Sequence, residues 1–231
     1  MEYSRRLARV PDSYFGKTMG QEVKHGPLPL INMAVGMPDG ETPRGILDTF
    51  AEALYQPENQ KYGAFHGKAT FKQAITQFYK RHYDVDLDPE EEVCILYGTK
   101  NGLVSLPTSI VNPGENVLLP DPGYTDYLAG VLLADAVPVP LQLDPPHYLP
   151  DWTRVPSDII SNTKLVYLTY PNNPTGSVAT LETFEEAIQL FKNTPTRIVH
   201  DFAYSAFGFD APNPSILQVE GAKDVAIEIF S

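Results

Sequence analysis

Cysteine is nearly absent from this sequence of 231 residues, which contains only Cys94. A single cysteine cannot build a disulfide framework or a cysteine cluster that binds zinc or iron–sulfur. The five histidines show no spacing typical of a metal site either. These absences indicate a reducing, cytoplasmic setting, and we expect Cys94 to be a small buried side chain within a strand.

Basic residues and long apolar runs are also scarce. Lys and Arg number 17 against 29 Asp and Glu, so the formal net charge is −12. This balance disfavours nonspecific binding to nucleic acid and to anionic membranes. No apolar run approaches the roughly 20 residues that a membrane-spanning helix needs. The phosphate-loop motif G-x-x-x-x-G-K-[ST] and the hydrolase motif G-x-S-x-G do not occur. We therefore predict no nucleic-acid partner and no membrane partner.

Proline, in contrast, is plentiful, with 22 residues in short phrases that mark loops and the ends of elements. Between these phrases the apolar residues alternate between helical and strand patterns. Helices are expected over about 43–55, from Gly67 to Tyr79, and over 101–111, 124–135 and 181–191. Strands are expected over 93–97, 117–119, 136–141, 165–169, 196–200 and 225–230. This alternation predicts the α/β class, with a mostly parallel sheet sandwiched by helices.

Ligands of such sheets bind beyond the carboxyl ends of the strands. The segment Gly98-Thr99-Lys100-Asn101-Gly102 follows one predicted strand, and its glycines and the start of the next helix suit an anion. Tyr124 follows the Pro-Gly turn after the next strand, where its ring could stack on a flat heterocycle. An ordinary strand-to-helix turn and a packed aromatic residue remain the alternatives.

The most specific phrase is Tyr170-Pro171-Asn172-Asn173-Pro174-Thr175-Gly176. Its prolines and glycine constrain the backbone enough to aim an asparagine amide at a ring oxygen. Asp201 directly follows an apolar strand and could pair with a protonated ring nitrogen, with Tyr204 three residues further on. A rigid turn without a ligand, a capping aspartate and a packed tyrosine are the alternatives, and His200 is expected to be a packed strand residue.

In order and spacing, these residues resemble the class I/II aminotransferases, pyridoxal-phosphate enzymes of fold type I. The resemblance covers essentially the whole chain. The Tyr-Pro-Asn-Asn-Pro-Thr-Gly phrase and the Asp-x-x-Tyr step 28 residues after Asn173 are its most specific parts. The loop over 98–102 is most similar to that of the LL-diaminopimelate-aminotransferase-like branch.

The resemblance implies a role for each candidate residue toward pyridoxal phosphate. Gly98, Thr99 and Lys100 would form the phosphate loop, and Tyr124 would stack on the pyridine ring. Asn173 and Tyr204 would hydrogen-bond the phenolic oxygen, and Asp201 would pair with the pyridine nitrogen. Asp201 and Tyr204 are thereby the catalytic candidates.

Three further residues receive roles by the same resemblance. Gly36 would lie beside the substrate carboxylate. Tyr62 would reach the phosphate of the other subunit, because these enzymes build their sites across a homodimer. Ser231 would be the first serine of the family's Ser-x-x-Lys phrase and a further phosphate ligand.

The resemblance also implies a domain division. Residues 1–42 would form the N-terminal arm and a small-domain segment. Residues 43–231 would form the pyridoxal-phosphate-binding large domain, truncated before the Schiff-base lysine expected three residues after Ser231. The chain is thus expected to be the N-terminal part of an aminotransferase that acts on amino acids and 2-oxo acids, and to be inactive by itself. A β-C–S lyase of the same fold and a non-catalytic remnant remain alternatives. An unpaired sheet edge over 225–230 predicts poor solubility or oligomers.

Overall fold

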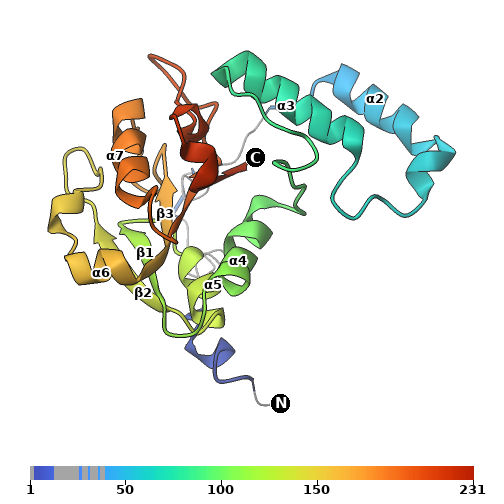
Figure 1. The fold of residues 1–231 in the computed structure, drawn as a ribbon. Coiled ribbons are helices and arrows are strands. Elements are labelled where there is room, and N and C mark those ends of the chain that lie inside the picture. The colour runs from blue at the N-terminus through green and yellow to red at the C-terminus, as the bar shows by residue number, and fades with distance from the viewer. Residues whose placement is uncertain (1–2, 13–25, 28–30, 32–35, 37–39) are drawn as a thin grey trace.

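A five-stranded parallel sheet forms the centre of the computed structural model, which describes residues 3–12, 26–27, 31, 36 and 40–231 (Figure 1). The strand order is β2-β1-β3-β4-β5, and each neighbouring pair is parallel. The predicted α/β class with a parallel sheet is confirmed. The strands are β1 (Asn116–Asp121), β2 (Val137–Gln142), β3 (Thr163–Thr169), β4 (Arg197–Phe202) and β5 (Ala226–Phe230).

Helices cover both faces of this sheet. On one face α7 packs on alternate strand residues such as Val166 and Ile198, and on the other α4 and α5 pack on residues such as Leu165 and Val199. Burial on both faces explains the near-continuous apolar run of the central strand β3. The helices are α2 (Arg44–Leu54), α3 (Ala69–Tyr83), α4 (Thr99–Ile110), α5 (Tyr127–Leu133), α6 (Ser157–Asn162) and α7 (Leu181–Phe191).

The expected strand over 93–97 does not form, and this prediction is wrong. A strand needs a neighbour to satisfy its backbone groups. In the part of the chain that the structure describes, the sheet ends at β5, and residues 93–97 pair with no strand. Cys94 is therefore exposed, against the expectation that it is buried.

The helix expected over 101–111 begins earlier, at Thr99, and passes through Pro107 without ending. Proline lacks the N–H that would bond to the carbonyl four residues before it, here that of Leu103. The hydroxyl of Tyr167 on β3 donates to this carbonyl instead, at 2.6 Å. A tertiary hydrogen bond thus replaces the missing helical one. The neighbouring helix is shorter than expected, because α5 covers only Tyr127–Leu133 of the predicted 124–135.

The helices α2 and α3 lie together to one side of the sheet (Figure 1). Only α3 is anchored to it, because Phe78 and Tyr79 pack against Phe230 of β5 with ring centroids 5.2 and 5.8 Å apart. The apolar face of α2 was correctly predicted from its periodicity, but it is exposed. Its residues are Ile46, Leu47, Phe50 and Leu54.

Strands β2 and β5 are the two edges of the sheet. Strand β2, with Pro138 and Pro140, forms one edge, where the missing N–H groups of proline do least harm. Strand β5 forms the other and pairs only with β4 among the described residues. The predicted open edge over 225–230 is confirmed for this part of the chain. Its effect on solubility stays a prediction.

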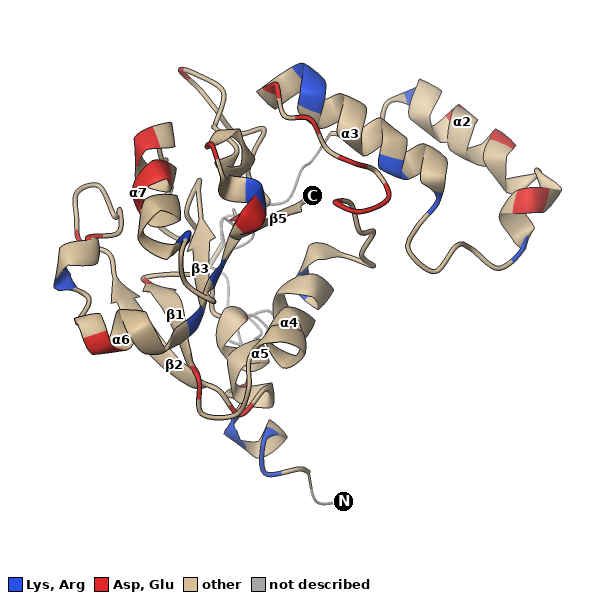
Figure 2. Cartoon of the chain, viewed as in Figure 1, with Lys and Arg blue, Asp and Glu red and all other residues tan. Residues whose placement is uncertain are grey.

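Acidic residues gather in the segment after α3 and on α7, whereas basic residues are dispersed (Figure 2). None of the helices described here has the length and apolarity to cross a membrane. The absence of a nucleic-acid partner stays a prediction. The domain division at residue 42 also stays a prediction, since most of 1–42 lies outside the described residues.

Candidate active site

The carboxyl ends of β1, β3 and β4 and the start of α4 bring the predicted loops together. Lys100 of α4 forms an ion pair with Asp126 in the segment after β1, with Nζ and Oδ2 2.6 Å apart. Asn172 after β3 donates to the carbonyl of Pro122, also after β1, at 3.5 Å. These contacts join segments that the sequence predicted separately.

The start of α4 carries hydrogen-bond donors of the kind that an anion requires. Gly98 has φ +87°, a conformation that residues with a side chain rarely adopt, and it immediately precedes the first helical residue, Thr99. The first N–H groups of an α-helix have no helical partner and carry the positive end of its dipole. The Thr99 hydroxyl and the Lys100 ammonium lie in this same turn. The predicted phosphate loop thus has the donors that the role requires.

Tyr124, Lys100 and Asp126 form one cluster beside this turn. The Tyr124 hydroxyl donates to Asp126 Oδ2 at 2.9 Å, and Lys100 Nζ lies 5.8 Å from the Tyr124 ring centre. Burial acts to raise the pKa of Asp126, but its contacts with Lys100 and Tyr124 outweigh it and hold this pKa below its ordinary value. The hydrogen bond to Asp126 in turn raises the pKa of Lys100. The tyrosine predicted to stack on a ring is therefore held by a charged pair.

Asp201 is buried at the end of β4 with one oxygen satisfied and one open. The Tyr127 hydroxyl donates to Oδ2 at 2.7 Å, whereas Oδ1 has no hydrogen-bond partner among the described residues. Burial raises the pKa of Asp201 above its ordinary value, although the bond from Tyr127 and the charge of His200 act against this. Buried polar atoms nearly always have a hydrogen-bond partner, so the open oxygen of this carboxylate calls for a donor. The open Oδ1 fits the protonated ring nitrogen predicted for this position.

The raised pKa of Asp201 predicts a specific pH dependence of stability. In the unfolded chain the carboxyl loses its proton near the ordinary value of 3.8, whereas in the folded chain it does so at higher pH. The folded state therefore binds more protons in this window, and the wild type loses stability there as pH rises. We expect Asp201→Asn, which carries no charge, to gain unfolding free energy relative to the wild type from pH 4 upward. Urea denaturation of both chains across this range checks it, and an unchanged difference would contradict it.

Asn173 and Tyr204 lie next to each other, as the prediction requires of two donors to one oxygen. Asn173 Nδ2 donates to the Tyr204 hydroxyl at 3.3 Å. The loop that carries Asn173 closes on itself, because the amide of Gly176 donates to the carbonyl of Asn172 at 2.7 Å. Gly176 has φ +73°, which explains the glycine at this position.

Three predicted residues are not drawn into this arrangement. The Tyr62 ring is fully exposed between α2 and α3, and Gly36 is exposed with its neighbours outside the described residues. Ser231 is exposed one residue after β5, at the carboxyl ends of the strands, where Asp201 also lies. The roles of these three residues stay predictions.

Two residues of the site were missed from the sequence. Asp126 pairs with Lys100, and Tyr127 supports Asp201 while its ring stacks on Tyr167, with centroids 4.6 Å apart. Tyr127 has the pattern of a core aromatic, and it is one: its ring is buried and only its hydroxyl reaches the site. No local signal in the sequence distinguishes that hydroxyl from any other.

The residues present fit pyridoxal phosphate. A helix start suits its phosphate, Tyr124 its ring face, Asn173 with Tyr204 its phenolic oxygen, and the open oxygen of Asp201 its protonated nitrogen. No group of His, Cys, Asp and Glu suited to a metal ion occurs among the residues that the structure describes.

The comparisons with known proteins point to one family. A structure of an aminotransferase from Staphylococcus aureus shares 71% identity with this chain, which it matches over 99% at a TM-score of 0.94. The L-glutamine–4-(methylsulfanyl)-2-oxobutanoate aminotransferase of Bacillus subtilis (strain 168) is 45% identical over the whole chain. The LL-diaminopimelate aminotransferase of Aquifex aeolicus (strain VF5) is 41% identical, also over the whole chain.

The chain spans only part of these relatives, namely 59% of the Staphylococcus aureus structure, 59% of the Bacillus subtilis protein and 60% of the Aquifex aeolicus protein. The model of the family "Aminotransferase class I and II" matches residues 29–228. That range includes the helix start, the paired Asn173 and Tyr204, and the buried Asp201. The chain therefore belongs to the class I and II aminotransferases.

Proposed function

We propose that the protein carrying this chain transfers an amino group from an amino acid to a 2-oxo acid, with pyridoxal phosphate as its cofactor. One observation carries the proposal: Asp201 is a buried carboxylate at the carboxyl edge of the sheet, and its Oδ1 has no hydrogen-bond partner in the part of the chain that the structure describes. The protonated ring nitrogen of pyridoxal phosphate would be the partner of this carboxylate.

Pyridoxal phosphate, when bound, supplies an electron sink for the bonds at the amino acid's α-carbon. The chain's residues hold and tune this group. Asp201 keeps the ring nitrogen protonated, and Asn173 with Tyr204 donates to the phenolic oxygen. Tyr124 covers one face of the ring and limits its rotation. Thr99 and the first amides of α4 bind the phosphate.

The substrate class follows from the relatives. One relative is named for glutamine and a methylsulfanyl 2-oxo acid, and another for LL-diaminopimelate. Both names contain an amino acid, and the first also contains a 2-oxo acid, so the proposal is made at the level of these two classes.

We also propose a cytoplasmic homodimer in which Tyr62 reaches the partner's phosphate group. The exposed apolar face of α2, formed by Ile46, Leu47, Phe50 and Leu54, supports a partner surface in this region. The fully exposed ring of Tyr62 lies in the same part of the chain. The single free cysteine supports the reducing compartment.

Two measurements test the proposal. The first is a fluorescence titration of the protein, in the length that the cell makes, with pyridoxal phosphate after removal of any bound cofactor, with inorganic phosphate as competitor. We expect saturable binding that phosphate weakens. The second supplies the protein, in the length that the cell makes, with an ¹⁵N-labelled amino acid and a 2-oxo acid, and follows the label by mass spectrometry. We expect the label in the new amino acid.

The control for the titration is Glu186→Gln, on the exposed surface of α7 and away from the site. It should bind pyridoxal phosphate as the wild type does. Failure of the wild type to bind saturably, or release of ammonia without labelled amino acid, would contradict the proposal.

A further inference from the structure

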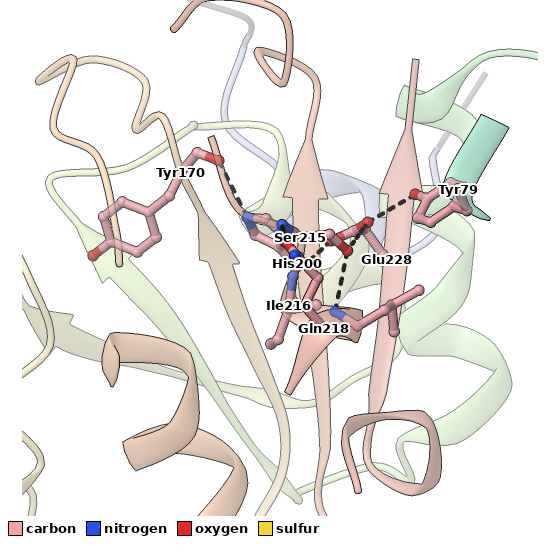
Figure 3. A network of polar contacts seen from close by, with 8 residues as sticks. Tyr79, Tyr170, His200, Ser215, Ile216, Gln218 and Glu228 are labelled. Carbon is pink, nitrogen blue, oxygen red and sulfur yellow. Dashed lines mark hydrogen bonds and ion pairs between the residues drawn. The ribbon is translucent and has the colours of Figure 1, made fainter. Parts of the chain in front are cut away.

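A fully buried histidine–glutamate pair lies directly behind the site and is not used by the proposed chemistry. His200 of β4 and Glu228 of β5 are opposed in the parallel register, and neither side chain is exposed to solvent. His200 Nδ1 lies 2.8 Å from Glu228 Oε2 (Figure 3). A buried pair of this kind is costly unless its remaining hydrogen bonds are satisfied, so its surroundings indicate what it does.

Glu228 is surrounded by donors. Its Oε1 accepts from the Tyr79 hydroxyl at 2.7 Å and from the Ser215 hydroxyl at 2.8 Å, and its Oε2 accepts from the Ile216 amide at 3.1 Å (Figure 3). Burial and the charge of Glu228 raise the pKa of Tyr79, which keeps Tyr79 a neutral donor. With His200 this makes two donors on each oxygen. Such a set favours an ionised carboxylate.

The two ring nitrogens of His200 face acceptors. Nδ1 faces the carboxylate of Glu228, and Nε2 lies 3.2 Å from the carbonyl oxygen of Tyr170. A carbonyl can only accept, so Nε2 carries a hydrogen. Glu228 already accepts three other hydrogen bonds, so the hydrogen between the two side chains is assigned to Nδ1. Both nitrogens are then protonated, and His200 is an imidazolium.

His200 is linked to two parts of the proposed cofactor site, by a contact to the first and along the strand to the second. Tyr170, whose carbonyl it holds, is the first residue of the loop that carries Asn173. Asp201 is the next residue along β4, and successive strand residues point to opposite faces. The charge of His200 favours the ionised form of Asp201.

We propose that His200 is a positioning residue that Glu228 holds as an imidazolium. In this form His200 fixes the first residue of the loop over 170–176 and supports the charge of Asp201 toward the cofactor. This inference rests on the proposed function. His200 itself touches neither cofactor nor substrate in this assignment.

The first test reads the protonation of His200 directly, without cofactor. The chain is labelled with ¹⁵N-histidine, and the ring nitrogens are observed by NMR at about pH 8.5, where solvent-exposed histidines are neutral. We expect one imidazolium signal, which is absent in His200→Gln. The groups that bear on His200 are Glu228 on β5, Tyr79 of α3 through Glu228, and Asp201 on its own strand. Five neutral histidines would overturn the proposal.

The second test uses Glu228→Gln, with Glu185→Gln on exposed α7 as the matched control that also removes one negative charge. We expect Glu228→Gln to lose the imidazolium signal and to bind pyridoxal phosphate roughly tenfold more weakly, because Asp201 loses the support of the His200 charge. The loss should be largest at low pH, where Asp201 gains a proton first. Binding equal to that of the wild type would overturn the proposal.

The outcomes separate this inference from the proposed function. If the wild type keeps the imidazolium but does not bind pyridoxal phosphate, the proposed function fails. If the wild type binds it with a neutral His200, the inference fails alone. Should Glu228→Gln not fold, as circular dichroism would reveal, the NMR measurement on the wild type still decides.

Discussion

Replacement of Asp201 by asparagine is expected to weaken pyridoxal phosphate binding by on the order of 100-fold. The substitution keeps the shape of the side chain and an acceptor for the Tyr127 hydroxyl, which lies 2.7 Å away. It removes the negative charge that would pair with the ring nitrogen at the open Oδ1. Loss of one partner from a buried charged hydrogen bond costs about 2–5 kcal/mol, and about 2.7 kcal/mol corresponds to 100-fold. Titration of both chains at one pH measures the ratio.

Asp158→Asn is the matched control, since it also removes one carboxylate but lies exposed on α6. It should leave the affinity within about twofold of the wild type, as surface substitutions do. The raised pKa of Asp201 adds a second signature, because Asp201→Asn should be the more stable chain at neutral pH while binding less tightly. Equal affinities of Asp201→Asn and the wild type would show that the carboxylate does not face the cofactor.

Replacement of Tyr127 by alanine is expected to cost about 3–5 kcal/mol of unfolding free energy, as for other large-to-small changes in a core. The Tyr127 ring is buried, stacks on Tyr167 and covers the Asp201 carboxylate. Tyr127→Phe keeps the ring and removes only the donor, which leaves both oxygens of Asp201 without a side-chain partner. The unmet hydrogen bond should cost about 1–3 kcal/mol. Urea denaturation of the three chains measures both steps.

The exposed Tyr55 supplies the control for the smaller step. Tyr55→Phe loses a hydroxyl at the end of α2, where the side chain is mostly in solvent. Its stability should equal that of the wild type within about 0.5 kcal/mol. If Tyr127→Phe matched it, the bond to Asp201 would carry no net stability, and the support assigned to Tyr127 would be wrong.

Strands β2 and β3 could be predicted from the residues that form them. The apolar run of β3 is typical of a central strand, because such a strand is buried on both faces. The prolines of β2 are typical of an edge strand, because proline lacks an N–H group for a second neighbour. Residues 93–97 also form an apolar run, but they form no strand. Pairing requires a partner strand, and the apolar pattern of a segment does not say whether one is present.

The candidate site divides in the same way. The types and order of Tyr124, Asn173, Asp201 and Tyr204 were readable from loops at strand ends, since parallel strands place their carboxyl ends at one edge. Thr99 was placed by the expected strand over 93–97, which does not form, and it lies at the start of α4. The contacts of Lys100 with Asp126 and of Tyr127 with Asp201 were not. The second of these joins residues 74 positions apart.

The sequence by itself determined the α/β class, the family and the residue types that face the carboxyl edge, because helical and strand periods and constrained loops are local properties of a chain. The tertiary structure decided which oxygen of Asp201 is left open and which hydroxyl, that of Tyr167, donates to the carbonyl of Leu103. It also decided that Glu228 contacts His200 behind the site. The physical reason is that hydrogen-bond partners in a buried core are selected by distances between strands and helices that fold together, and these distances are not properties of any one segment.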